Sequence, residues 1–186
     1  MISKSLTGKY TFNNSWMGVY AAKLQKGDDA ADWARRMLQD NVHLFDDTCL
    51  SEVHAGRDDY KKTPEIGAHG VLICNITQML LNGDNDKYIT IFPAIPETWQ
   101  QEGVAFSDLA AKGGLCVSAK LSNAEVNVTL ENKSSQNVIR ELRVRLRKNT
   151  EELTKALKDT RIENGWAIIP SMKLDPQKKI ELLFVK

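Results

Sequence analysis

The pattern of apolar and polar positions changes its period about halfway along the chain. Over residues 13–38 apolar side chains recur every three or four positions, with one interruption at residues 26–28. This spacing predicts two helices joined by a short turn, which form an antiparallel pair. Asp28 and Asp29 suit the start of the second helix, because acidic side chains there stabilise the free backbone N–H groups.

A polar, acidic stretch over residues 40–63 follows the helical pair, and it has no sustained period. We interpret it as a long loop. From Ala68 to Leu81 apolar side chains then fall on nearly every side of a helix, which predicts a helix buried all round. The turn-forming run Asn82–Asp86 ends this helix.

Short alternating runs replace the helical period after residue 86. They predict strands over residues 88–92, 104–110, 115–121, 125–131, 138–146, 167–169 and 180–185. Asn149 and Glu152 add a short helix over residues 149–158, in the manner of a capping box. Several short strands separated by turns are typical of an antiparallel sandwich. We therefore expect an α+β chain with a helical segment over residues 1–86 and an antiparallel β-sandwich domain over residues 87–186.

Composition and charge exclude several classes of protein. The net charge of +1 recommends neither nucleic acid nor an anionic membrane surface as a partner, and no run of about 18 apolar residues predicts a membrane span. Cys49, Cys74 and Cys116 have no metal-like spacing. We expect no metal, no cofactor and no disulfide framework. The first eight residues contain no apolar core of a secretion signal, and the cellular location stays open.

Carboxylates and histidines gather shortly before the apolar helix, and they are the candidates for chemistry. Hydrolysis of a glycosidic bond needs a carboxylic acid and a carboxylate on opposite sides of the sugar. Glu65 is the candidate catalytic residue, because it precedes a helix start and is followed by glycines that allow a close backbone approach. Glu52, His54 and His69 are candidate substrate-binding residues. The alternatives are a solvated acidic loop and, for His69, packing into the core.

Two motifs in the middle of the chain resemble a known family. Residues 78–81, followed after a short turn by Ile89–Trp99 (ITIFPAIPETW), resemble a signature at the end of the catalytic barrel in large bacterial glycoside hydrolases. Val104–Ala119 resembles the first hairpin of their C-terminal β-domain. Over roughly residues 10–132 the chain is similar to the alpha-L-fucosidases of glycoside hydrolase family 95, which have a six-hairpin (α/α) toroid, and to their uncharacterised relatives. The resemblance implies that the helices are the last hairpins of such a toroid and that the ligand is a carbohydrate.

The resemblance includes one departure in the catalytic segment. The fucosidases carry an Ile-Asp-Gly-Asn-Phe-Gly type motif before the buried helix, and its aspartate is the general base. Residues 65–70 here are Glu-Ile-Gly-Ala-His-Gly, so Glu65 is the nearest carboxylate and is displaced by at least one position. The general acid of these enzymes comes from an earlier hairpin, and full-length relatives are commonly exported.

Chain length decides between a whole enzyme and a part of one. Twelve helices of about 11–12 residues, with their connections, need on the order of 250 residues. We therefore expect the C-terminal part of such a glycosidase, inactive alone, whose partner is the missing N-terminal part of the barrel or another subunit.

Two other interpretations remain open. The chain can be a stand-alone module whose sandwich recognises a glycan or packs against a subunit. Trp99, Phe106 and Trp166 are then candidates to contact sugar faces, although each also suits the core. The chain can also be a structural homo-oligomer that associates through an exposed apolar helical face.

Overall fold

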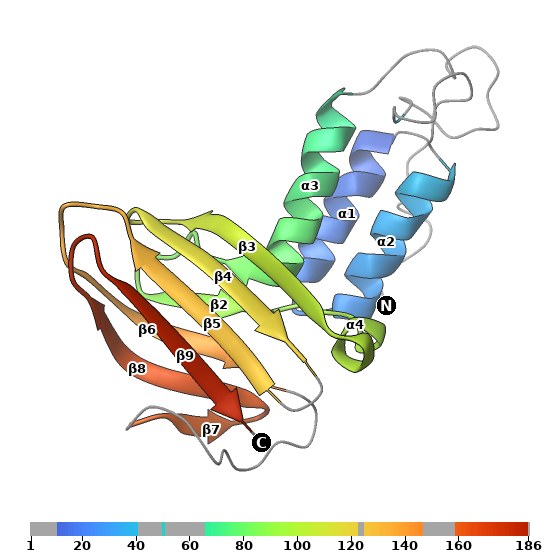
Figure 1. The fold of residues 1–186 in the computed structure, drawn as a ribbon. Helices are drawn as coiled ribbons and strands as arrows, with labels where there is room; N and C mark the ends of the chain where they lie inside the picture. The colour runs from blue at the N-terminus through green and yellow to red at the C-terminus, as the bar shows by residue number, and fades with distance from the viewer. Residues whose placement is uncertain (1–10, 41–49, 51–65, 123–124, 147–158, 186) are drawn as a thin grey trace. The chain divides into compact units, whose positions relative to one another are not determined.

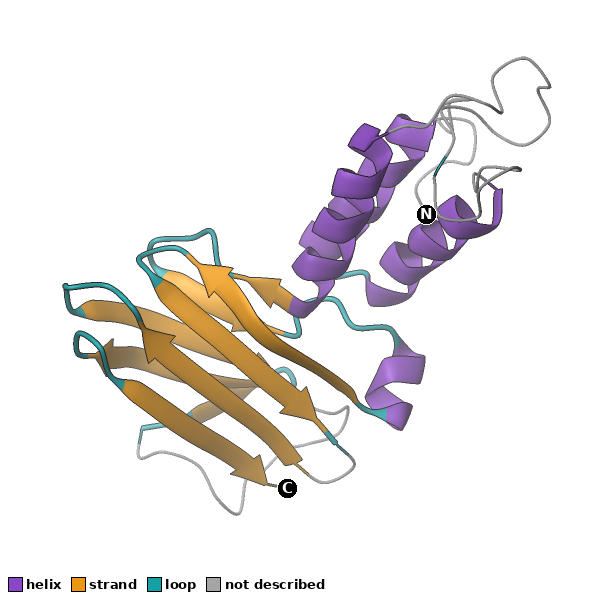
Figure 2. Ribbon diagram, turned by 45° about the horizontal axis from the view of Figure 1, so that its top comes forward, coloured by secondary structure: helices purple, strands orange, loops and turns teal. Residues whose placement is uncertain are grey.

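The computed structural model describes residues 11–40, 50, 66–122, 125–146 and 159–185 (Figure 1). The chain divides into two compact units, which we call the helical unit (residues 1–79 and 94–96) and the β-unit (residues 80–93 and 97–186). The α+β class is confirmed, because helices come first and the sheets follow (Figure 2). The boundary expected after residue 86 stays a prediction.

The described part of the helical unit contains three helices. They are α1 (Thr11–Lys23), α2 (Gly27–Asp40) and α3 (Ile66–Leu80). The first two form the expected pair, and Gln25 takes a positive φ of 58° in the turn between them. Gly27 starts the second helix where a Cβ atom would lie 2.6 Å from Ala94 O, so a side chain there would collide with backbone. None of the helices described is long and apolar enough to cross a membrane.

The expectation that α3 is buried all round is wrong for this unit. The helix buries one stripe, made of Ala68, Val71, Asn75 and Met79 at spacings of three and four. On its other sides Ile66 is 83% exposed, Ile73 66% and Ile76 36%. The apolar residues of α3 show how much surface this helix is able to bury. The neighbouring elements described in this unit cover only one side of it.

The β-unit contains two sheets that pack face to face (Figure 1). Its described elements are β1 (Leu81–Asn82), β2 (Tyr88–Ile91), α4 (Glu97–Glu102), β3 (Val104–Ala111), β4 (Leu115–Leu121), β5 (Glu125–Asn132), β6 (Val138–Arg145), β7 (Arg161–Glu163), β8 (Trp166–Leu174) and β9 (Lys179–Val185). One sheet has the order β1-β2-β6-β8-β7 and the other β3-β4-β5-β9.

Neighbouring strands in these sheets are antiparallel, except for β2 and β6, which are parallel. All seven expected strands are present, and β8 is longer than the expected run over residues 167–169. β1, β7 and α4, which are each six residues or shorter, were not predicted. The helix predicted over residues 149–158 lies outside the described residues.

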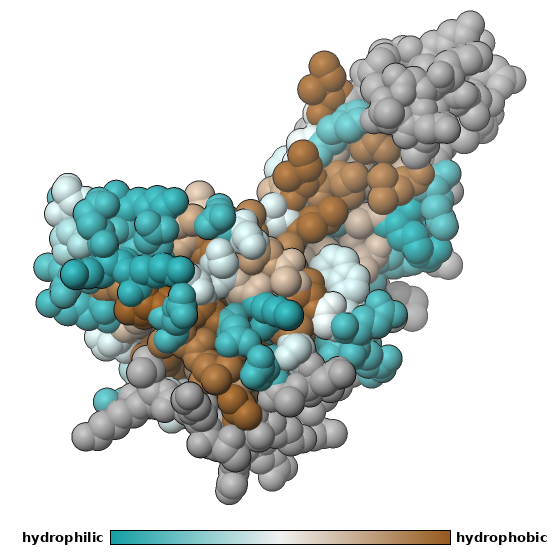
Figure 3. All heavy atoms as spheres, viewed as in Figure 1, coloured by the Kyte–Doolittle hydropathy of each residue, from teal (hydrophilic) through white to brown (hydrophobic). Residues whose placement is uncertain are grey.

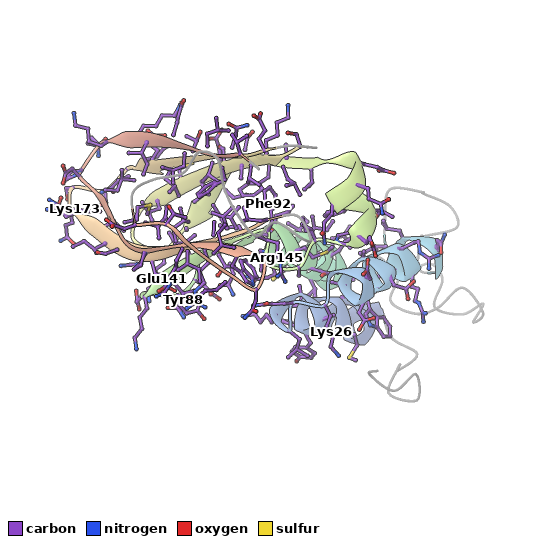
Figure 4. All side chains as sticks on the ribbon, turned by 90° about the horizontal axis from the view of Figure 1, so that it is seen from below. Lys26, Tyr88, Phe92, Glu141, Arg145 and Lys173 are labelled. Atoms are coloured by element: carbon purple, nitrogen blue, oxygen red, sulfur yellow. The ribbon has the colours of Figure 1, made fainter. Side chains whose placement is uncertain are left out.

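The inward-facing side chains form the core of the β-unit. Along β5 burial alternates strictly, as a strand with one face toward a core requires. Phe92 is fully buried and lies between the sheets (Figure 4). Its ring meets Phe106 edge to face at 5.5 Å between centroids, a favoured aromatic geometry. Phe106 is thus a core residue, which was one of the two roles left open for it.

Candidate functional site

The predicted site residues fall in different parts of the chain. Glu52, His54 and Glu65 lie outside the described residues. His69 belongs to the helical unit and Trp99 to the β-unit. Within the described ranges there is no group of three or more His, Cys, Asp or Glu side chains that could hold a metal ion.

His69 makes a defined contact inside the helical unit. Its Nε2 atom accepts a hydrogen bond from the backbone N–H of Leu50 at 3.0 Å. Leu50 packs in a small apolar cluster with Met37 and Ala68, next to the half-buried Leu72. A ring nitrogen that accepts a hydrogen bond carries no proton. This contact supports the core-packing alternative for His69, and its role in substrate binding stays a prediction.

Trp99 lies in the short helix α4 of the β-unit and is half-buried. The N–H of Gly103, which has a positive φ of 94°, donates to Trp99 O at 2.9 Å and ends α4. This geometry explains why the helix stops before β3. The proposed contact between the Trp99 side chain and a sugar stays a prediction.

Exposed apolar side chains are the most prominent surface feature of the helical unit. Trp16 and Tyr20 on α1, and Leu24 directly after its end, are spaced four residues apart and are 36%, 53% and 61% exposed. The Trp16 and Tyr20 rings stack at 6.1 Å. Apolar atoms also gather over α3, where the exposed isoleucines lie (Figure 3). On α2 a large apolar side chain, Leu38, is also exposed, at 50%.

The outer side of α2 is different in character, because it carries charged residues. Asp32 forms ion pairs with Arg35 and with Arg36, the second at 2.7 Å. The Arg36 guanidinium also lies 5.5 Å from the Trp33 ring centre. Such a face is stable in water. Most of the exposed large apolar side chains described in this unit therefore lie on or next to α1 and α3, and Leu38 is the one on α2.

Two arginines stack on aromatic rings along the outer face of the five-stranded sheet. The Arg143 guanidinium lies 4.5 Å from the Tyr88 ring centre, and that of Arg145 lies 4.1 Å from the Trp166 ring centre. Both arginines are on β6, where alternate residues share a face, and Arg145 is directly opposite Trp166 on β8. Tyr88, Glu141 and Arg145 are labelled in Figure 4. Glu141 forms an ion pair with Arg143 at 2.5 Å.

Arg145 differs from Arg143 in having no carboxylate partner in the described part of the chain. One terminal nitrogen donates a long hydrogen bond to the carbonyl oxygen of Asn164, at 3.5 Å. Burial of the guanidinium lowers its pKa below the ordinary value, because a half-buried cation loses hydration. Asn164 and Gly165 have φ values of 50° and 78°, as in a tight hairpin turn, and this turn places the carbonyl oxygen beside Arg145.

A small polar cluster lies on the outer face of the four-stranded sheet. The Cys116 thiol lies 3.5 Å from a carboxylate oxygen of Asp108. Burial and this hydrogen bond raise the pKa of the thiol, which keeps it protonated and weakly nucleophilic. Asp108 itself sits at an irregularity of β3 with a φ of 57°, and its N–H donates to Ser118 Oγ. The cluster is therefore a fixed structural feature and not an activated cysteine.

An open groove of about 770 Å³ lies along β8 and β9 of the β-unit. Its lining is mostly apolar and includes Ile169, Met172 and Leu182, with Lys173 and Glu181 among its polar residues. Asp159 and Glu181 both line it, so two carboxylates belong to this groove.

Comparisons with known proteins give matches among solved structures only. No family model and no curated protein matches the chain. An alpha-amylase from Anoxybacillus, described as giving insights into a new glycosyl hydrolase subclass, is 14% identical, with a TM-score of 0.29 over 72% of this chain and 26% of that one. Ara127N-Se, a GH127 beta-L-arabinofuranosidase from Geobacillus stearothermophilus T6, is 12% identical, with a TM-score of 0.36 over 94% and 31%. The chain spans about a quarter to a third of the length of these two structures. Neither is an alpha-L-fucosidase.

Proposed function

We propose that this chain is the C-terminal part of a bacterial glycoside hydrolase and has no hydrolytic activity by itself. In this proposal α1 and α3 pack against further helices of the enzyme, as in the last hairpins of a six-hairpin toroid of the family 95 kind. The observation that carries the proposal is the exposed apolar surface of these two helices.

The size of this surface argues against a helical unit that is complete in water. Tyr20, Leu24, Ile66 and Ile73 are each more than half exposed. Burial of one such side chain contributes roughly 1.5–3 kcal/mol when it is complete. In this proposal these side chains belong to an interaction surface, whereas the charged side of α2 that carries Asp32, Arg35 and Arg36 faces water.

The chemistry of glycosidic cleavage leads to the same proposal. Hydrolysis needs two carboxyl groups at a defined separation on opposite sides of the sugar. Glu65 is proposed as the general base, which activates a water molecule. The general acid then comes from another segment of the complete enzyme, so that a sugar is held between the two.

The test compares the 186-residue chain with a longer polypeptide. The coding DNA upstream of Met1 is sequenced, and the joined polypeptide that it encodes is purified beside the shorter chain. On a panel of aryl glycosides we expect hydrolysis by the joined polypeptide only, with at least about a hundredfold loss in Glu65→Gln. Hydrolysis by the shorter chain, an upstream frame without amphipathic helices, or full activity of Glu65→Gln would each contradict the proposal.

Carbohydrate binding by the β-unit is a second candidate function. The stack of Arg145 on Trp166 favours it, because it combines an aromatic ring with a charged hydrogen-bond donor on one sheet face. This function does not depend on a complete catalytic barrel.

A further inference from the structure

The starting observation is an arginine whose charge is not balanced by its surroundings. Arg145 is half-buried, and within the described residues it has no ion pair. Partial burial of a cation has a free-energy cost, which a carboxylate partner normally offsets. Binding of an anion beside this guanidinium would therefore be favourable in free energy.

The neighbouring charges on the same sheet are already paired. Arg143 is bound to Glu141, and on β7 Arg161 lies 3.0 Å from Glu163. Arg145 follows Arg143 by two residues on β6 and is the additional cation. The site thus has room for one negative charge.

The stacked geometry leaves the hydrogen-bonding edge of Arg145 available. A ring contact uses the flat face of the guanidinium, while its five N–H donors point outward in the plane of the group. The Asn164 carbonyl takes up one nitrogen at the long distance of 3.5 Å. The remaining donors match the two oxygens of a carboxylate, which arginine binds in a bidentate manner.

We propose that Arg145 binds the carboxylate of a uronic acid residue in a glycan, on the outer face of the five-stranded sheet. The carboxylate requirement stands on Arg145 alone, and the sugar requirement rests on the second candidate function. Trp166 and Tyr88 offer apolar ring surface for the C–H groups of a pyranose. The carboxylate oxygens of Glu141 can accept hydrogen bonds from the hydroxyl groups of the sugar.

The test measures binding of two matched probes to the full chain. A trimer of galacturonic acid and a trimer of galactose are titrated against the wild type, Arg145→Gln and Arg161→Gln. The second variant is the control, because it removes the same charge one strand away from the proposed site. We expect the acidic trimer to bind the wild type at least about tenfold more tightly than the neutral one. Arg145→Gln should abolish this preference, and Arg161→Gln should change affinity by less than about twofold.

A second measurement separates binding from a merely structural role of the stack. If Arg145 is retained for ligand binding, Arg145→Met keeps the contact with Trp166, removes the half-buried charge and leaves the melting temperature unchanged or higher. If the arginine only holds the sheet together, the same variant melts at a lower temperature, which would overturn the inference.

Four binding results would also overturn it. They are no binding of the acidic trimer to the wild type, equal binding of both trimers, unchanged binding by Arg145→Gln, and equally tight binding of an acidic peptide. The two proposals fail separately. If the joined polypeptide hydrolyses aryl glycosides but the chain gives one of these four binding results, the proposed catalytic function stands and only the Arg145 site is overturned.

Discussion

The contact between Gly18 and Asn75 allows a quantitative test of how the helical unit is held together. Gly18 of α1 faces Asn75 of α3, whose side chain is fully buried and donates a hydrogen bond to Ala30 O at 3.2 Å. A Cβ atom at position 18 would overlap the Asn75 amide nitrogen and lie 2.7 Å from its Cγ. Gly18→Ala therefore forces the buried amide out of position.

Three contributions determine how much Gly18→Ala changes the free energy of unfolding. A buried amide that loses its hydrogen bond costs about 1–3 kcal/mol, and the extra methyl group in a filled interface costs about 1–3 kcal/mol. Alanine in place of glycine within a helix returns about 1 kcal/mol. We expect Gly18→Ala to lower the free energy of unfolding by about 1–5 kcal/mol.

Gly70→Ala is the matched control, because it makes the same substitution within α3 at an exposed position. A Cβ atom there meets nothing within 4 Å, so we expect a gain of up to about 1 kcal/mol from helix propensity. Urea unfolding followed by circular dichroism measures both changes. Adding Asn75→Ala to Gly18→Ala should recover stability relative to the sum of the single changes. Equal effects of the two glycine substitutions would refute this account of the interface.

Three further predictions concern the β-unit. Asn132→Asp should lower the free energy of unfolding by at least about 3 kcal/mol in urea, because the buried amide donates to three carbonyl oxygens that a carboxylate would face; a stable variant would contradict this. A hydrogen bond from Lys112 lowers the pKa of Asp86, so its stabilisation is present above pH 3.8, the ordinary value, and is lost as the pH falls through the lower folded-state value. Asp86→Asn should accordingly lower the melting temperature at about pH 7 and leave it unchanged at about pH 2. Burial and then the Asp108 carboxylate raise the pKa of the Cys116 thiol. Asp108→Asn removes the second of these causes and should speed alkylation of Cys116 at about pH 8, measured by mass spectrometry.

Local patterns in the sequence were sufficient to predict most elements of the fold. The interruption predicted at residues 26–28 lies close to the observed break at residues 24–26 between α1 and α2. The strands of the second half follow from alternation that burial confirms, as along β5. These patterns work because each element buries one side against a nearby core. The α+β class follows from the order of the elements.

Features that depend on distant neighbours could not be predicted in this way. The apolar positions of α3 gave no indication that Ile66 and Ile73 would be exposed. Helical periodicity does not show how many other elements pack against a helix. The parallel pairing of β2 with β6 joins segments about fifty residues apart in the chain, and strand patterns carry no information on which strands become neighbours.

The candidate site shows the same division between local and distant information. His69 and Leu50, which are in contact, lie 19 residues apart in the sequence. No sequence motif predicts this contact. A local signal for the Arg145 site was present, since Asn164–Gly165 between two short alternating runs indicates a tight hairpin. That hairpin places Trp166 opposite Arg145.

The interleaved course of the chain has a consequence for how such a protein can be inherited. The helical unit takes in residues 94–96, which lie within the sequence of the β-unit, and Ala94 N donates to Met79 O at 3.2 Å. No single cut in the gene therefore separates the two units intact. Recombination can transfer them as a pair. A single cut after residue 79 would take residues 94–96 from the helical unit, and one after residue 96 would take β1 and β2 from the β-unit.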